Sequence, residues 1–111
     1  MKKTLRNYNF EFDKSERRII IAFCKQVLKQ VTGKSDLFRT ERAFNTILDK
    51  INANEEVVKF TKEEYINLSE QLKQNIRFFQ EQTKKVWFFK KWIYKSMISQ
   101  YTVIYENHFK D

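Results

Sequence analysis

Residues 12–33 read FDKSERRIIIAFCKQVLKQVTG, and this stretch decides the fold class. Apolar side chains recur along it every three or four residues, the period of a helix with one buried side. They are Ile20, Phe23, Cys24, Val27, Leu28 and Val31. Asp13 stands before the pattern and Glu16 three residues later, which is the spacing of a capping box. Because Gly33 suits a left-handed helix end, we expect an amphipathic helix from about Lys14 to Thr32.

Further elements are predicted on both sides of this helix. Residues 7–12 alternate between apolar and polar side chains, as a short half-buried strand does, and residues 56–60 are a second extended candidate. A second helix follows a cap at Ser35 or Asp36 and ends near 52–54. Thr61 and Glu64 then form another capping box, which opens a third helix.

A fourth helix is predicted over about 84–107. Since no glycine or proline separates it from the third, a single long bent helix from Thr61 onward is an alternative. The predicted fold class is therefore mostly α. We expect a single helical domain over residues 1–111, with three to four amphipathic helices and a minor two-stranded β patch formed by residues 7–12 and 56–60.

Composition excludes several functional classes. The 111 residues contain one Gly, no Pro, one Cys and one His. Glycine-rich phosphate loops, a disulfide framework and a Cys/His zinc site all need more of these residues. Cys24 falls on an apolar helix side, and His108 has no catalytic partner in the sequence. We therefore expect no enzymatic activity, no cofactor and no metal site.

Apolar runs are too short to predict a transmembrane segment. The longest, Ile19 to Cys24, is far below the roughly 20 residues that a spanning helix needs. The richest stretch, residues 86–105, is interrupted by Lys90, Lys91 and Lys95. The polar residues after Met1-Lys2-Lys3 also argue against a secretory signal. These features predict a cytoplasmic protein.

The net charge of +8 is unevenly distributed. Residues 1–34 carry +6, residues 35–83 carry −2 and residues 84–111 carry +4. On the first helix, four cations fall on one line opposite the apolar side: Lys14, Arg18, Lys25 and Lys29. An acid-free line of this kind is either a solvated face or a surface that follows a phosphate backbone.

Residues 84–95 read KKVWFFKKWIYK and are the most informative stretch for function. A helix here would bury a stripe of Val86, Phe89, Ile93, Met97 and Ile104. Its opposite side would then present Lys84, Phe88, Lys91 and Lys95, flanked by Trp87 and Trp92. Aromatic rings among lysines are typical of surfaces that bind single-stranded nucleic acid, where bases stack on rings and lysines neutralise phosphates.

We therefore predict a small accessory protein that binds nucleic acid, with single strands favoured, in a replication, transfer or regulatory complex of a mobile genetic element. The predicted contact residues are Lys14, Arg18, Lys25, Lys29, Lys84, Lys85, Phe88, Lys91, Trp92 and Lys95. The alternative is a protein-binding module (an inhibitor, immunity factor or obligate subunit) that docks onto a larger acidic protein through Trp87 and Trp92. Burial of the fourth helix on both sides and contact with an anionic membrane surface are further interpretations, the latter ranked last. The oligomeric state is left open.

Overall fold

The structure is a computed structural model that describes residues 8–110, without the side chain of Phe89. Its elements follow the order β1 (Tyr8–Phe10), α1 (Lys14–Val31), a 3-10 turn (Ser35–Leu37), α2 (Phe38–Asn52), β2 (Val58–Phe60), α3 (Lys62–Thr83), α4 (Phe88–Ile104) and a π-helical turn (Tyr105–Phe109). The predicted mostly α class with a small two-stranded sheet is confirmed. The expectations for residues 1–7 and 111 lie outside the described residues.

The chain divides into two compact units, which meet within α3 between Leu68 and Ser69. The first unit contains β1, α1, α2, β2 and the start of α3. The second contains the remainder of α3, α4 and the π-helical turn. The single domain predicted for the whole chain stays a prediction.

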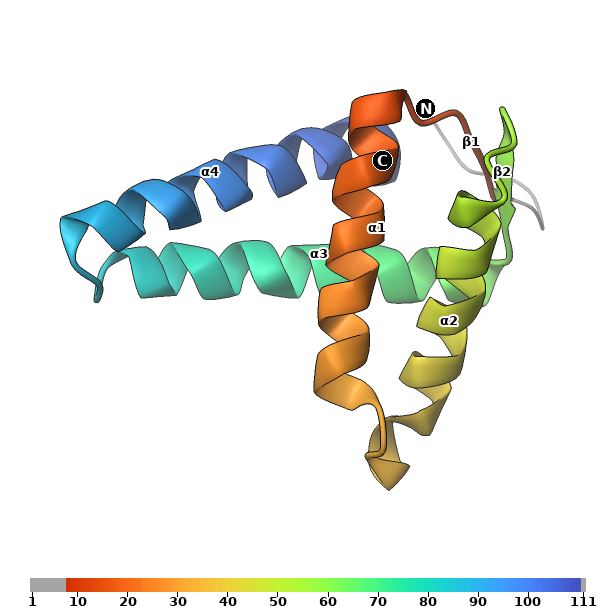
Figure 1. Cartoon of the computed structure of the whole chain (residues 1–111), viewed down its shortest axis with the longest axis horizontal. Coiled ribbons are helices and arrows are strands. Elements are labelled where there is room, and N and C mark those ends of the chain that lie inside the picture. The colour runs from red at the N-terminus through yellow and green to blue at the C-terminus, as the bar shows by residue number, and fades with distance from the viewer. Residues whose placement is uncertain (1–7, 111) are drawn as a thin grey trace. The chain divides into compact units, whose positions relative to one another are not determined.

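In the first unit, α1 and α2 form an antiparallel helical hairpin (Figure 1). The predicted apolar side of α1 is buried at Ile20, Phe23, Cys24, Val27 and Val31. Phe23 contacts Phe44 of α2 edge to face, with ring centroids 6.4 Å apart. This helix pair forms the main core of the unit because both helices bury one continuous apolar stripe.

The two strands of the first unit pair antiparallel, with Tyr8 opposite Phe60 and Phe10 opposite Val58. Phe10, Val58 and Phe60 are buried, which accounts for the alternating pattern in the sequence. The observed strands are shorter than residues 7–12 and 56–60, and Asn7 lies outside the described residues. The predicted β patch is nevertheless present.

Both predicted capping boxes are formed. The Glu16 amide donates to Asp13 Oδ1 (2.7 Å), and the Asp13 amide donates to Glu16 Oε1 (3.1 Å). At the start of α3, the Thr61 amide donates to Glu64 Oε1 (2.9 Å), and the Glu64 amide donates to Thr61 Oγ1 (3.1 Å). These reciprocal bonds fix both helix starts because they satisfy amides that have no partner within the helix.

The expected cap of α2 at Ser35 or Asp36 is wrong. Residues Ser35–Leu37 form a 3-10 turn, and α2 begins at Phe38 after Leu37, without a side-chain capping bond. Gly33 has a φ of 84°, in the left-handed region that favours glycine. That residue closes α1 as predicted, and the tight turn after it delays the start of α2.

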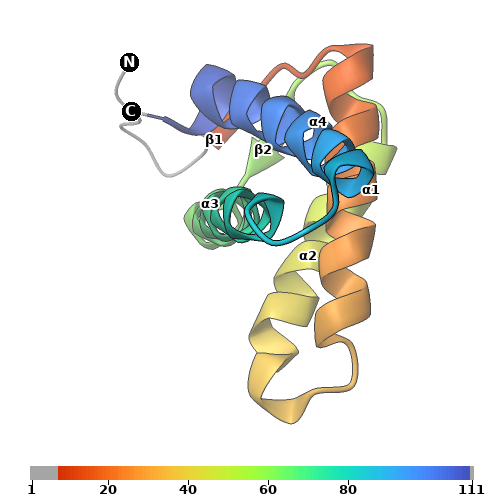
Figure 2. The same cartoon turned by 90° about the vertical axis from the view of Figure 1, so that its left-hand side faces the viewer.

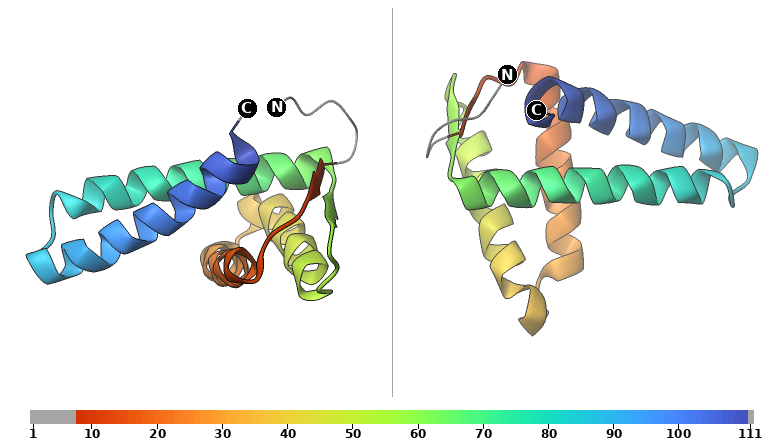
Figure 3. Two further views of the ribbon diagram at one scale, coloured as in Figure 1. Left: turned by 90° about the horizontal axis from the view of Figure 1, so that it is seen from above. Right: turned by 180° about the vertical axis from the view of Figure 1, so that it is seen from behind.

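In the second unit, α3 and α4 run antiparallel and are joined by a turn at residues 84–87 (Figures 2 and 3). Phe79 of α3 contacts two rings of α4, Tyr94 at 5.2 Å and Tyr101 at 6.2 Å between centroids. The single bent helix is therefore wrong, and so is the predicted start of α4 at 84. The chain reverses at residues 84–87, which allows Phe79 of α3 to pack against Tyr94 and Tyr101 of α4.

Candidate functional site

The described parts of the two units differ in net charge. Residues 8–68 carry eleven Lys and Arg against ten Asp and Glu, a net charge of +1. Residues 69–110 carry eight against three, a net charge of +5. Between Glu81 and Glu106 the sequence contains no acid at all. The second unit therefore holds most of the excess positive charge of the described residues.

Three aromatic side chains are exposed around the start of α4. The exposed fraction is 76% for Trp87, 79% for Phe88 and 75% for Trp92. Trp87 is the last extended residue before the helix, and Phe88 and Trp92 lie one helical turn apart. Because Tyr94 and Tyr101 occupy the side of α4 that packs against Phe79, Phe88 and Trp92 lie on the side that faces away from this contact.

Most of the predicted lysines accompany these rings. Lys95 falls on the same side of α4 as Phe88 and Trp92 at 100° per residue and is exposed. Lys84 and Lys85 are exposed in the turn before α4 rather than on the helix. We call the combination of Lys84, Lys85, Trp87, Phe88, Trp92 and Lys95 the aromatic–lysine face.

Lys91 lies at the edge of this face and is half-buried, so it is less available than predicted. Lys84 forms an ion pair with Glu81 at 3.7 Å, between two exposed side chains. No described residue forms an ion pair with Lys85, Lys91 or Lys95. Lysines without an acidic partner can pair with an external anion.

The predicted buried stripe of α4 is wrong at Ile93, which is 47% exposed. The helix turns Tyr94 and Tyr101 toward α3 instead, while Ile104 is buried as expected. Val86 and Met97 are half-buried, and the side chain of Phe89 lies outside the described part of the chain. The start of α4 consequently exposes one aliphatic and three aromatic side chains.

The predicted line of cations on α1 is also on the surface. Lys14, Arg18, Lys25 and Lys29 are all exposed, with Ala22 exposed between them. We call these four cations the α1 basic line. Within residues 8–110, no ion pair engages any of them. The line belongs to the first unit, whereas the aromatic–lysine face belongs to the second.

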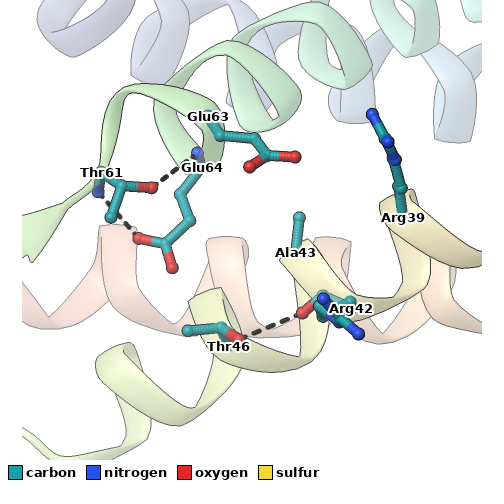
Figure 4. Close-up of a pocket in the computed structure, with 7 residues that line it drawn as sticks. All are labelled: Arg39, Arg42, Ala43, Thr46, Thr61, Glu63 and Glu64. Atoms are coloured by element: carbon teal, nitrogen blue, oxygen red, sulfur yellow. Dashed lines mark hydrogen bonds between the residues drawn. The ribbon is translucent and has the colours of Figure 1, made fainter.

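Sequence reasoning missed a polar pocket of about 520 Å³ in the first unit (Figure 4). It lies between α2 and the start of α3, and its lining residues are Arg39, Arg42, Ala43, Thr46, Thr61, Glu63 and Glu64. The sequence did contain one signal for this pocket. Two arginines lie at the start of α2, where the helix dipole disfavours cations. Glu64 already holds Lys50 (2.6 Å) and caps α3, so the pocket carries both signs of charge and no clear excess.

Cys24 and Tyr101 are among the buried titratable side chains of residues 8–110. Cys24 is fully buried, and this burial raises the pKa of its thiol to about 12. Burial likewise raises the pKa of the Tyr101 hydroxyl. Across residues 8–110, no group of three His, Cys, Asp or Glu side chains is placed to hold a metal ion. In the same part of the chain, no helix has the length and apolarity needed to cross a membrane.

Comparisons with known proteins assign no family. No protein-family model, no curated protein sequence and no solved structure matches the chain. Among the described residues, the aromatic–lysine face combines the most exposed aromatic rings with exposed lysines, of which Lys85 and Lys95 have no acidic partner.

Proposed function

We propose that the protein binds single-stranded nucleic acid through the aromatic–lysine face, without reading its sequence. The observation that carries the proposal is the exposure of Trp87 and Trp92, each at least three-quarters exposed, beside lysines without acidic partners. A ring that remains in water forgoes about 1.5–3 kcal/mol of burial free energy. Exposed apolar groups of this size mark surfaces that contact a ligand or a partner.

Unpaired bases supply the complement to these rings. Stacking of a base on an aromatic side chain contributes about 1–3 kcal/mol and tolerates any base. Phe88 and Trp92 are separated by four residues, a rise of about 6 Å along the helix axis. Two exposed rings at this separation present platforms to neighbouring bases of an extended strand.

Phosphates are matched by the charge of the second unit. Lys85 and Lys95 lie on either side of the rings in sequence, and the unit as a whole carries +5. Each neutralised phosphate releases counterions, so the affinity for a strand should fall steeply with salt. Base-specific contacts need donors and acceptors in a fixed arrangement; the lysines and indole N–H groups of this face supply donors but no side-chain acceptor, so we expect little base preference. We therefore assign the protein an accessory role in a replication, transfer or regulatory complex of a mobile genetic element.

The test is fluorescence anisotropy with a labelled oligothymidine, an abasic strand of the same length and a blunt duplex, each over a salt series. We expect the oligothymidine to bind more tightly than the abasic strand, which has the phosphates but no bases. Trp92→Ala should weaken oligothymidine binding by roughly 5- to 150-fold, the equivalent of one stacked base. Phe38→Ala removes an exposed ring from the first unit and serves as the matched control. Equal affinity for the two strands, or no binding at low salt, would refute the proposal.

A protein-binding module is the second candidate, and the exposure of Ile93 favours it. An aliphatic side chain offers no stacking platform, but it does add to an apolar docking surface. Ile93→Ser should leave oligothymidine affinity unchanged if the face binds strands. A purified acidic partner protein that binds stoichiometrically after nuclease treatment, and is lost in Ile93→Ser and Trp92→Ala, would support docking instead. Binding to anionic lipid vesicles but not to strands would indicate a membrane surface.

A further inference from the structure

The exposed side of α1 has a composition that the solvated face of a helix rarely shows. Its exposed residues are Lys14, Ser15, Arg18, Ala22, Lys25, Gln26, Lys29 and Gln30. Four of these eight residues are cations, and none is an acid or an aromatic residue. A surface selected only for solubility normally intersperses both signs of charge.

This segregation occurs although the described part of the first unit has almost as many acids as cations. Residues 8–68 contain ten acids and carry a net charge of +1, yet no acid is exposed on α1. Glu16, the one acid within α1, is half-buried and engaged in the capping box with Asp13. Within residues 8–68, α1 has five cations and one acid, whereas the remaining residues together have six cations and nine acids, so the net positive charge lies on α1.

We infer that the α1 basic line is a second nucleic-acid contact, which binds the phosphate backbone of a duplex. From Lys14 to Lys29 the line rises about 22 Å along the helix axis. A duplex advances about 3.4 Å per base pair, so the line matches about six to seven base pairs. The bases of a duplex are already stacked on each other, and its backbone therefore needs cations but no aromatic platform. The absence of rings from the exposed side of this described helix distinguishes it from the aromatic–lysine face.

The inferred duplex contact does not depend on the proposed function. One consequence of it does depend on the proposed function. If the second unit binds single strands, one chain carries contacts for both forms of nucleic acid. A duplex with a single-stranded tail should then bind more tightly than either form alone, because the second contact becomes intramolecular.

The experiment compares two variants that remove the same charge from exposed positions of the first unit. One is K14Q/R18Q/K25Q/K29Q, which removes the α1 basic line. The other is K34Q/R39Q/K59Q/K62Q, which removes four exposed cations elsewhere in that unit. Binding of a labelled 12-base-pair blunt duplex is measured from 50 to 200 mM salt. Far-UV circular dichroism melts check that both variants are folded.

We expect only the first variant to lose duplex affinity. Four phosphate contacts contribute about −3.6 to the slope of log affinity against log salt, a change of roughly a hundredfold over this range. The second variant should retain most of the wild-type slope. If both variants lost the same duplex affinity, net charge alone would explain the effect. If the first variant bound the duplex as the wild type does, the α1 basic line would not be a duplex contact. Either result would overturn the inference.

The same titrations separate the two proposals. Oligothymidine binding and its effect on tryptophan fluorescence should be unchanged in K14Q/R18Q/K25Q/K29Q, because both tryptophans are in the second unit. Absence of any oligothymidine binding, together with a duplex slope that depends on the α1 basic line, would refute the proposed function and leave this inference intact. Oligothymidine binding together with a duplex slope that does not depend on the α1 basic line would refute this inference and leave the proposed function intact.

Discussion

Replacing Arg17 tests how the first unit is held together. Its guanidinium donates from Nε to the carbonyl of Phe12 (3.2 Å) and from Nη1 to that of Ile51 (3.5 Å). Its Nη2 donates to the carbonyls of Glu55 and Glu56. One side chain thereby joins the segment before α1, the last turn of α2 and the loop that leads into β2. Arg17 is separated from Ile51 and from Glu55 by more than thirty residues in sequence.

The expected cost of Arg17→Ala follows from these bonds. A hydrogen bond from a charged donor contributes about 1.5–3 kcal/mol when buried and less when solvent competes. Two of the four bonds are exposed and one is long. We therefore expect the free energy of unfolding to fall by about 2–4 kcal/mol. Arg17→Lys should lose more than half of this amount because an ammonium group cannot reach three segments as a planar fork does.

Arg18 is the matched control, since it is adjacent, has the same side chain and is exposed without a hydrogen bond to any described residue. Arg18→Ala should change the free energy of unfolding by no more than about 0.5 kcal/mol. Urea denaturation followed by circular dichroism at 222 nm gives both values. Equal midpoints for Arg17→Ala and Arg18→Ala would refute the assignment of Arg17 as a connecting residue.

Three further predictions concern single positions in the first unit. The native pKa of Cys24 is about 12 against an ordinary 9, so above pH 9 the unfolded chain loses this proton first. The corresponding part of the free energy of unfolding is fully present below pH 9 and is lost as the pH rises to 12. At pH 10.5 the free energy of unfolding should have fallen by about 2 kcal/mol more in the wild type than in Cys24→Ala. Identical pH profiles of the two proteins would contradict this prediction. Gly33→Ala should cost about 1 kcal/mol in a thermal melt because φ is 84° with no neighbouring atom in the way, and Gly33→Asn should cost less. Glu64→Ala should cost about 2 kcal/mol by removing both the cap and the partner of Lys50, whereas Glu64→Gln should cost about half as much by keeping an oxygen for the Thr61 amide; equal melting temperatures would count against that assignment.

Local rules predicted the parts of the fold that depend on neighbouring residues. The capping boxes at Asp13 and Thr61 and the helix end at Gly33 each involve residues within a few positions of each other, so their spacing identifies them. The apolar period of α1 likewise predicted its buried side and therefore the exposure of its cations. The role of these cations in binding nucleic acid stays a prediction. Their position on the surface is established by the structure.

Features that depend on packing between elements were not predictable in this way. The chain breaks at residues 84–87 because Phe79 packs against Tyr94 and Tyr101, which no local signal shows. The same contact rotates α4 so that Ile93 faces outward. The boundary between the two units was not predictable either. Residues 69–83 belong to the same unit as α4, so this boundary falls within α3 rather than at its end. The pocket lined by Arg39 and Thr61 joins two helices that are distant in sequence.

The most direct test of strand binding is the intrinsic fluorescence of the protein, because its only two tryptophans, Trp87 and Trp92, both lie in the aromatic–lysine face. Acrylamide should quench the free protein strongly, since both rings are exposed. Saturating oligothymidine should quench the tryptophan emission and protect the remaining emission from quenching by acrylamide. The Kd from this titration should equal the Kd from anisotropy. The abasic strand should neither quench the emission nor protect it. Unchanged emission and unchanged acrylamide quenching at saturating oligothymidine would contradict the proposal that bases stack on this face.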